Sequence, residues 1–355
     1  MLPIRYTQIN EEFLAGGFGT VQKVKDTYLD RVVLFKAMQN PEDNDQLLNE
    51  IRGLSKARSR HVVEIYDVLR GENGDIFGII IEYLGGSDYI DFHLEARSNP
   101  EKYMRILYQI SCGLRDLHAA GVIHRDLKLQ NMKESESGLL KIFDFGLSTN
   151  DSNYRTGTNR GTRLYSAPEF YVPNVLITPE MDMYALGICA WTLSTNQYPS
   201  ELLEAPPQKS KRAPSINTVM AGFIHPDIVG LIDSCLDPRP TYRPTALEFS
   251  QTMARHLTRD RHRGLFTEGQ KAVYELSESK RHVQITIGTL GSISARYDGL
   301  NFSIGYVTGS VFLNNIPIKP GQILHNACVL TFGGPELGSS RQWVIFSKSQ
   351  PEVVF

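Results

Sequence analysis

The sequence predicts an α+β chain with a small β-rich lobe, a larger helical lobe and a separate all-β domain at its C-terminal end. From residue 13 to residue 82, short runs rich in β-branched and aromatic residues indicate strands, with one helical stretch among them. After the paired glycines at 85 and 86, apolar residues recur at helical spacing. Later the runs are again short and β-rich, and Gly, Asn and Pro turns separate them. The predicted parts are residues 1–84, residues 85–257, a basic linker at 258–269 and the all-β domain at 270–355.

Each predicted helix follows from the spacing of its apolar residues. In the first lobe, the stretch 43–57 places Leu47 and Ile51 on one face. In the second lobe, the stretch 101–121 has the same period and stops at Gly121, a residue suited to the C-cap of a helix. Further helices are predicted over 181–193, 225–236 and 245–257, and the Pro- and Lys-rich stretch 205–214 is predicted to be a loop.

The composition is that of an ordinary globular protein. Of its 355 residues, 41% are hydrophobic and 21% are charged, and the formal net charge of −2 gives no bulk attraction to nucleic acid or membranes. No apolar run approaches the roughly 20 residues of a membrane-spanning helix. The four cysteines are scattered without metal-ligand spacing, as buried free thiols of a reducing compartment are. We therefore expect a cytoplasmic protein with no membrane or nucleic-acid partner.

Glycines cluster near the start of the chain, in the stretch LAGGFGTV at 14–21. Gly16, Gly17 and Gly19 would let main-chain N–H groups approach a phosphate closely, because no Cβ stands in the way. A glycine-rich hairpin is also an ordinary tight turn, so this pattern alone indicates little.

A lysine and a glutamate follow in the next two predicted elements. Lys36 ends the half-buried run VVLFK, and Glu50 lies 14 positions later (50 − 36) in the first predicted helix. A partly buried lysine needs a partner, so an ion pair with Glu50 would hold its ammonium group against phosphate. Taken singly, each residue is equally well an ordinary surface charge.

Two further motifs complete the pattern. HRDLKLQN occupies residues 124–131, and DFG occupies residues 144–146. After the glycine loop, Lys36 and Glu50, and in this order, they resemble the catalytic loop and the metal-binding motif of the eukaryotic-type protein kinase family. The resemblance covers about residues 5–257 and implies a bilobal protein kinase fold.

The resemblance implies a chemistry for these residues. Asp126 would be the catalytic base that receives the proton of a substrate hydroxyl, and Lys128 would neutralise charge on the transferred phosphoryl group. Asn131 and Asp144 would bind Mg²⁺, for which Mn²⁺ can substitute. A lysine at position 128 resembles the Ser/Thr branch of the family. The implied reaction transfers the γ-phosphate of ATP to serine and threonine hydroxyls of protein substrates.

The resemblance also implies a nucleotide pocket. Val21 and the three glycines would cover the nucleotide, and Ile81 would stand at the back of the adenine pocket. The main chain from Glu82 to Leu84 would bind the edge of the adenine. Asp88 would face the ribose, although a solvated acid in a turn is the other interpretation of this residue.

The segment that ends in GTRLYSAPE, at 161–169, would carry substrate docking and regulation. Thr162 resembles the threonine that contacts both the catalytic base and the catalytic lysine. Thr158 resembles an activating phosphosite, and Arg125 would receive its phosphate after autophosphorylation. The other interpretation of Thr158 is a loop threonine without a regulatory role.

Residues that brace the fold of this family are also matched, with two departures. Asp182 resembles the aspartate that holds the catalytic loop, and Arg243 resembles the arginine that pairs with Glu169. Leu14 stands where the family usually has the first glycine of its phosphate loop, so a side chain there would stiffen the loop and crowd ATP. Tyr184 replaces a common tryptophan.

The later strands of the C-terminal part resemble a forkhead-associated domain, a β-sandwich that binds phosphothreonine. The stretch GSVFLNN at 309–315 is similar to a turn of that family. Thr289, however, stands where a phosphate-binding arginine is expected. A degenerate sandwich used for protein contacts is therefore favoured over a phosphopeptide site, and an unrelated β domain stays open.

Three other functions compete with a protein kinase. A pseudokinase or scaffold would lack Lys36, Asp126 or Asp144, and all three are present. A small-molecule phosphotransferase generally lacks a docking segment such as 161–169. The all-β domain could also be the functional centre, with the kinase as its regulator.

Overall fold

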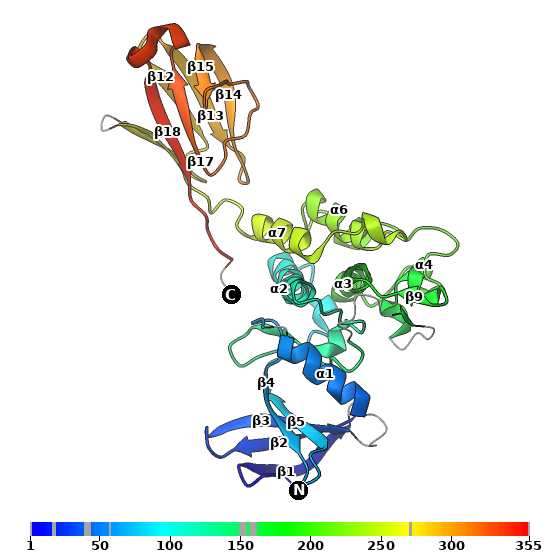
Figure 1. The fold of residues 1–355 in the computed structure, drawn as a ribbon. Helices are drawn as coiled ribbons and strands as arrows, with labels where there is room; N and C mark the ends of the chain where they lie inside the picture. The colour runs from blue at the N-terminus through cyan, green and yellow to red at the C-terminus, as the bar shows by residue number, and fades with distance from the viewer. Residues whose placement is uncertain are drawn as a thin grey trace. The chain divides into compact units, whose positions relative to one another are not determined.

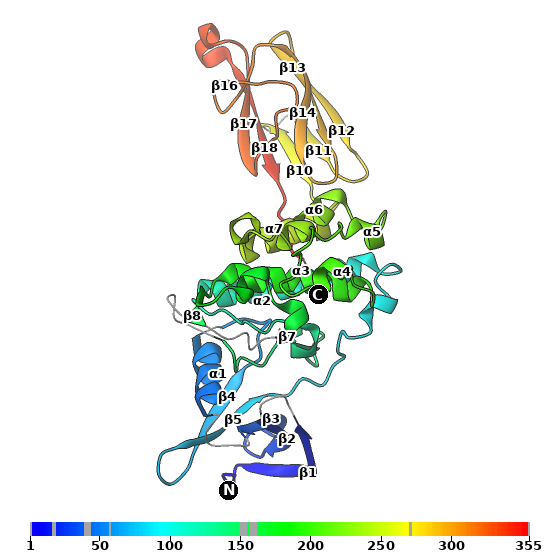
Figure 2. The same ribbon diagram turned by 90° about the vertical axis from the view of Figure 1, so that its right-hand side faces the viewer.

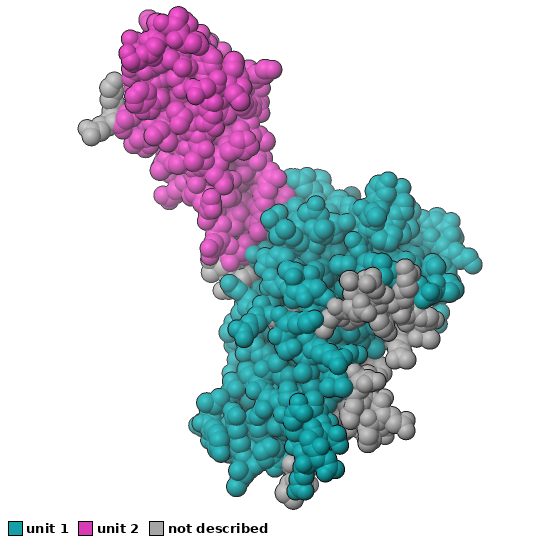
Figure 3. All heavy atoms as spheres, viewed as in Figure 1, with its two compact units in different colours: residues 1–253, 355 teal, residues 254–354 magenta. Residues whose placement is uncertain are grey.

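The computed structural model describes residues 2–15, 19–38, 44–56, 58–148, 155–156, 162–269 and 272–353. The chain divides into two compact units, Met1–Met253 and Ala254–Val354 (Figure 3). Each unit has buried apolar cores of its own and is described by itself. Among the residues described, no helix has the length and apolarity needed to cross a membrane.

The first unit begins with a five-stranded antiparallel sheet in the order β1-β2-β3-β5-β4 (Figure 1). Its strands are β1 (Tyr6–Ala15), β2 (Gly19–Asp26), β3 (Arg31–Met38), β4 (Ile65–Arg70) and β5 (Ile76–Glu82). Helix α1 (Asn44–Lys56) packs beside β4 and β5 and buries Leu47 and Leu54. The helical spacing of these residues thus gives the helix that the sequence predicts among the strands.

Helices build the rest of the first unit. Helix α2 (Pro100–Ala119) starts at Asn99, whose side chain accepts the Lys102 N–H, and ends before Gly121, whose φ of 73° favours glycine. Thirteen of the 16 residues of α3 (Pro179–Ser194) are buried, so this apolar helix lies in the core. The other helices are α4 (Ser200–Leu203), α5 (Asn217–Met220), α6 (Pro226–Cys235) and α7 (Ala246–Leu257), and the short strands are β6 (Met132–Glu134), β7 (Leu140–Ile142), β8 (Arg155–Thr156) and β9 (Val175–Leu176).

The second unit contains two antiparallel sheets (Figure 2). The larger has the order β11-β10-β18-β17-β15-β16, and the smaller has the order β12-β13-β14. Their strands are β10 (Gly264–Glu268), β11 (Ala272–Leu276), β12 (His282–Ile287), β13 (Gly291–Tyr297), β14 (Phe302–Gly309), β15 (Val311–Leu313), β16 (Ile316–Pro317), β17 (Ala327–Phe332) and β18 (Gln342–Lys348). Both sheets contribute to one core, with Ile285 and Ile293 from one and Phe332 and Phe346 from the other.

The stretch 258–269 differs from the predicted linker, because β10 lies within it and pairs with both β11 and β18. The charged residues before this strand conceal it in the sequence, and its alternation of exposed Leu265 and buried Phe266 is short. Glycine is needed at position 264, the first of the strand, because a Cβ there would lie 2.7 Å from the ring of Phe302. The sheet of the second unit therefore starts earlier than the sequence predicts.

Candidate active site

Asp182 of α3 holds the main chain of the HRD motif in place. Its Oδ2 accepts the His124 N–H at 2.9 Å, and its Oδ1 accepts the Arg125 N–H at 2.8 Å. Arg125 has a φ of 70°, a left-handed conformation that is costly for a residue with a side chain. Burial alone would raise the pKa of Asp182, but the hydrogen bond with His118 and the Arg125 N–H lower it below its usual value. A buried carboxylate therefore fixes the loop that carries the predicted base.

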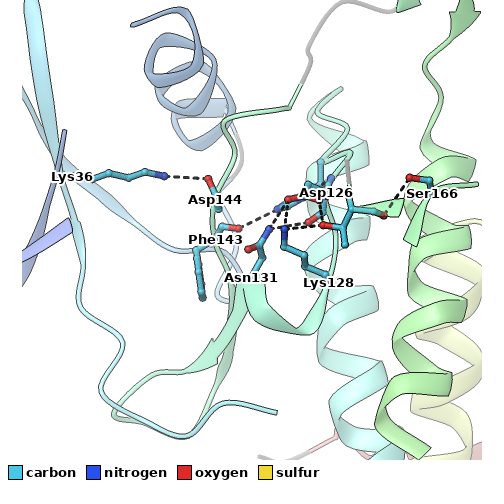
Figure 4. A network of polar contacts seen from close by, with 9 residues as sticks. Lys36, Asp126, Lys128, Asn131, Phe143, Asp144 and Ser166 are labelled. Atoms are coloured by element: carbon cyan, nitrogen blue, oxygen red, sulfur yellow. Dashed lines mark hydrogen bonds and ion pairs between the residues drawn. The ribbon is translucent and has the colours of Figure 1, made fainter. Parts of the chain in front are cut away.

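Asp126 is the centre of a polar network (Figure 4). Lys128 Nζ donates to Asp126 Oδ2 at 2.7 Å, and Asn131 Nδ2 donates to the same oxygen at 3.2 Å. The N–H and Oγ1 of Thr162 donate to Asp126 Oδ1 at 3.1 and 3.0 Å. Lys128 also donates to Thr162 Oγ1 at 3.0 Å. The structure thus brings three predicted site residues, Lys128, Asn131 and Thr162, to the carboxylate of a fourth.

Lys36 of β3 joins two acidic residues from distant parts of the chain. Its Nζ lies 2.7 Å from Glu50 Oε2 on α1 and 3.1 Å from Asp144 Oδ1. Burial would lower the pKa of Lys36, but the two carboxylates outweigh burial and raise it above its usual value. Burial likewise opposes ionisation of Asp144, whereas Lys36 holds the pKa of that carboxyl below its usual range. The charged forms of Lys36 and Asp144 are therefore favoured, whereas burial raises the pKa of Glu50 above its usual value.

Asn131 and Asp144 form a donor set that fits Mg²⁺. The Phe143 N–H donates to the Asn131 carbonyl at 3.0 Å, which places Asp144 next to Asn131 (Figure 4). Asn131 Nδ2 is committed to Asp126, with its main-chain oxygen at 2.9 Å, so the amide oxygen is the atom that Asn131 can offer. An amide oxygen and a carboxylate are hard ligands of the kind that Mg²⁺ prefers.

The described residues of the predicted nucleotide pocket come from inner strands of the first sheet and from the chain that follows β5. Val21 of β2 is half-buried and pairs with Lys36 of β3, and Gly19 begins β2. Glu82 ends β5, and buried Leu84 follows it. Asp88 is exposed, and its Oδ1 accepts the Ile90 N–H at 3.1 Å, so its geometry is that of a turn acid.

Several predicted residues lie outside the described part of the chain. These are Gly16 and Gly17 of the glycine loop and Thr158 of the regulatory segment. Arg125, predicted to receive the phosphate of Thr158, donates from Nη1 to the Leu147 carbonyl at 2.9 Å. The side chain of Arg125 therefore lies against the residue that follows the DFG motif.

Arg243 and Glu169 form the predicted pair. The two nitrogens Nη1 and Nη2 of Arg243 donate to Glu169 Oε1 and Oε2 at 2.6 and 2.8 Å, a bidentate arrangement. The guanidinium of Arg243 also lies 5.0 Å from the centre of the Tyr184 ring. The tyrosine that replaces the family tryptophan thus faces a cation with its aromatic ring.

Two residues near the site are not among those that the sequence predicts for it. His118 Nε2 lies 2.9 Å from Asp182 Oδ2, and Lys141 Nζ lies 2.8 Å from Glu82 Oε2. A lone histidine near the end of an amphipathic helix carries no spacing signal. Lys141 does carry one, because a lysine within the apolar run LLKIF is buried and needs an acidic partner.

The sequence is similar to those of known proteins. Residues 8–254 match the family model described as the protein kinase domain. The serine/threonine-protein kinase pkn3 of Myxococcus xanthus is 29% identical over 276 residues, which cover 70% of this chain and 49% of that protein. Serine/threonine-protein kinases drp72 of Corynebacterium efficiens is 32% identical over 217 residues, or 54% of this chain and 41% of that protein.

A mammalian relative shows the same likeness. NUAK family SNF1-like kinase 1 of Mus musculus is 32% identical over 193 residues, which cover 52% of this chain and 29% of that protein. The chain thus spans less than half the length of each of these relatives. Since the family model covers residues 8–254 of the 355, the chain belongs to the protein kinase family.

Proposed function

We propose that this chain is an ATP-dependent serine/threonine protein kinase that phosphorylates serine and threonine hydroxyls of protein substrates. One observation carries the proposal. Lys36 forms ion pairs with Glu50 at 2.7 Å and with Asp144 at 3.1 Å, beside the polar network of Asp126. The relatives named as serine/threonine kinases support the choice of substrate hydroxyl. The hydrogen bond from Lys128 to Thr162 supports it as well, because this pair matches the Ser/Thr branch.

In this proposal the residues divide the reaction between them. Asp126 orients the substrate hydroxyl and receives its proton, a contribution of about 10²- to 10⁴-fold in rate. Lys128 neutralises charge on the transferred group, and Lys36, held by Glu50, binds the phosphates that are not transferred. Mg²⁺ held by Asn131 and Asp144 would neutralise charge on the ATP phosphates.

The proposal also covers the nucleotide pocket and the regulation of the enzyme by phosphorylation. The glycines at 16, 17 and 19 and Val21 would cover the nucleotide, and the main chain of Glu82 to Leu84 would bind the adenine edge. Asp88 would contact the ribose from its exposed turn. Phosphorylation of Thr158 would order the loop around Arg125, whose contact with the Leu147 carbonyl links it to that loop.

The test is incubation of the purified chain with ATP and Mg²⁺ beside Asp126→Ala, followed by phosphosite mass spectrometry. We expect phosphate on serine and threonine in the wild type only, with Thr158 among the sites. Asp91→Ala is the matched control, since Asp91 is an exposed acid whose side chain caps no N–H group. Equal labelling of wild type and Asp126→Ala, or no labelling of either, would favour the pseudokinase or scaffold.

For the second unit, we propose a role in protein contacts. Support comes from apolar side chains on the outer face of the larger sheet, where Trp343 is 57% exposed and Ile345 is 48% exposed. Val329 pairs with Ile345 across β17 and β18 and is exposed on the same face. A phosphothreonine site is less well supported, since Thr289 supplies no guanidinium. Titration of the full chain with phosphothreonine peptides and their unphosphorylated forms separates the two, because only a phosphate site distinguishes them.

A further inference from the structure

A cleft lies on the first lobe, apart from the residues of the proposed active site. Its volume is about 670 Å³, and the last turn of α1 and the chain between α1 and β4 line it. The buried side chains of Leu54, Val62 and Val63 provide an apolar floor. Exposed Arg58 and Arg60 line the same cleft, together with exposed Glu64. The cleft therefore combines an apolar floor with cationic side chains.

Basic side chains outnumber acidic ones around the cleft, where exposed Glu64 is an acidic lining residue. No acidic residue occurs between Glu50 and Glu64, whereas four basic residues do, namely Arg52, Lys56, Arg58 and Arg60. Among the described residues, neither Arg58 nor Arg60 forms an ion pair. Ser59, in contrast, is committed to α2, because its Oγ donates to Asp116 Oδ2 at 2.5 Å. The two arginines are thus available to an acidic ligand, and a surface of this kind complements carboxylates.

Two residues of the cleft floor connect the cleft to residues of the active site. Leu54 lies four residues, about one helical turn, after Glu50 on α1, and Glu50 is the partner of Lys36. The Val63 N–H donates to the Ile142 carbonyl at 3.0 Å, and Ile142 precedes Asp144 by two residues. Figure 2 shows α1 beside β4. A ligand in this cleft would therefore contact the supports of both Glu50 and Asp144.

We propose that this cleft is a docking site for an acidic linear segment of a partner protein that carries one large apolar anchor residue. The apolar side chain fills the floor formed by Leu54, Val62 and Val63, and the flanking carboxylates pair with Arg58 and Arg60. A peptide suits this site better than nucleic acid, because the net charge of the chain is −2 and the cleft is lined by apolar side chains. Binding of such a segment would also shift α1 and so change the ion pair between Lys36 and Glu50. The effect of this change on catalysis rests on the proposed kinase function.

The test is selection of a randomised peptide display library on the full-length chain, followed by titration of the most enriched peptide by fluorescence polarisation. We expect enriched sequences with Asp or Glu beside one Phe, Leu, Ile or Trp. The double variant Arg58→Glu/Arg60→Glu should weaken the Kd at least tenfold, whereas Arg70→Glu should change it less than twofold. Arg70 is the control because it is exposed on the same lobe, on β4, and does not line the cleft.

Hydrogen exchange provides a second measurement that does not depend on the variants. The enriched peptide should slow exchange at residues 54–65 of the wild type. Enrichment of the same peptides by the double variant, enrichment without acidic residues, no enrichment at all, or protection elsewhere only would each overturn the proposal.

The docking site and the proposed function fail separately. If the peptide binds and no phosphate is transferred with or without it, the docking site stands and the kinase proposal fails. If the chain phosphorylates substrate and no acidic peptide is selected, the kinase proposal stands and the docking site fails.

Discussion

Replacement of Asp182 by asparagine should destabilise the first unit. The wild-type side chain is 1% exposed and accepts hydrogen bonds from the N–H groups of His124 and Arg125 and bonds to His118. Asparagine keeps one oxygen, so its NH₂ group faces at least one N–H group that has lost its acceptor. A buried donor without a partner costs about 1–3 kcal/mol, and hydrogen bonds to a charged group are stronger than neutral ones. Asp182→Asn should therefore lower the free energy of unfolding by about 2–4 kcal/mol.

The same change should impair catalysis. Arg125 loses a contact that holds its left-handed main chain, and a displacement of about 1 Å at neighbouring Asp126 would cost about 10²-fold in rate. Urea unfolding and steady-state phosphorylation of a protein substrate measure the two effects. Exposed Asp91, changed to asparagine, is the control and should shift stability by less than about 0.5 kcal/mol. An Asp182→Asn variant that keeps kcat and unfolds within about 1 kcal/mol of the wild type would refute this reasoning.

Three further predictions concern pH, ion pairing and packing. Burial lowers the pKa of His61 from 6.5 to about 4, so its stability contribution is present above pH 6.5 and is lost as pH falls toward 4. Urea unfolding should show that the free energy of unfolding of the wild type falls by roughly 2–3 kcal/mol over this pH range, and that His61→Gln lacks this fall. The same pH dependence of the free energy of unfolding in both proteins would contradict the prediction. Arg243→Lys should destabilise by about 1–3 kcal/mol, because lysine cannot form the bidentate bonds to Glu169, and an unchanged Tm would argue against this. Gly264→Ala should destabilise the second unit by about 1–3 kcal/mol through its clash with Phe302, seen as faster hydrogen exchange in β10; unaltered exchange would exclude it.

Much of the fold could be predicted because its elements are long and regular. The first helix follows from the helical spacing of Leu47 and Leu54, both buried. The end of α2 follows from Gly121, whose positive φ favours glycine. Strand β10 could not be predicted in the same way, since only five residues form it and charged residues precede it. Its place in the sheet depends on pairing with β18, which is distant in sequence.

The candidate site likewise has a part that could be predicted from the sequence and a part that could not. Asp126, Lys128 and Asn131 lie within eight residues of one motif, so local chain geometry alone keeps them close. Lys36 and Asp144 are 108 positions apart and could be joined only through the family resemblance. His118 acts through buried Asp182 on another element, a contact that no local sequence pattern indicates. The apolar run around Lys141 indicates that this lysine needs an acidic partner, but it does not identify Glu82. The partners of His118 and Lys141 are therefore supplied only by the structure, whereas the bracing roles of Asp182 and Arg243 are predicted through the family resemblance.

Two non-glycine residues of the site have a left-handed main chain. Arg125 and Asp144 both have left-handed main chains, with φ of 70° and 67°, although neither is glycine. Such a conformation costs roughly 1–3 kcal/mol and persists only where the surroundings hold it. Asp182 holds Arg125 through the N–H bond at 2.8 Å, and Lys36 holds the side chain of Asp144 at 3.1 Å. The first brace lies in the core helix α3, whereas the second depends on the position of α1 through Glu50. A partner that moves α1 would therefore act on Asp144 and leave Asp126 in place, which gives the cleft beside α1 a selective route to the metal-binding side of the site.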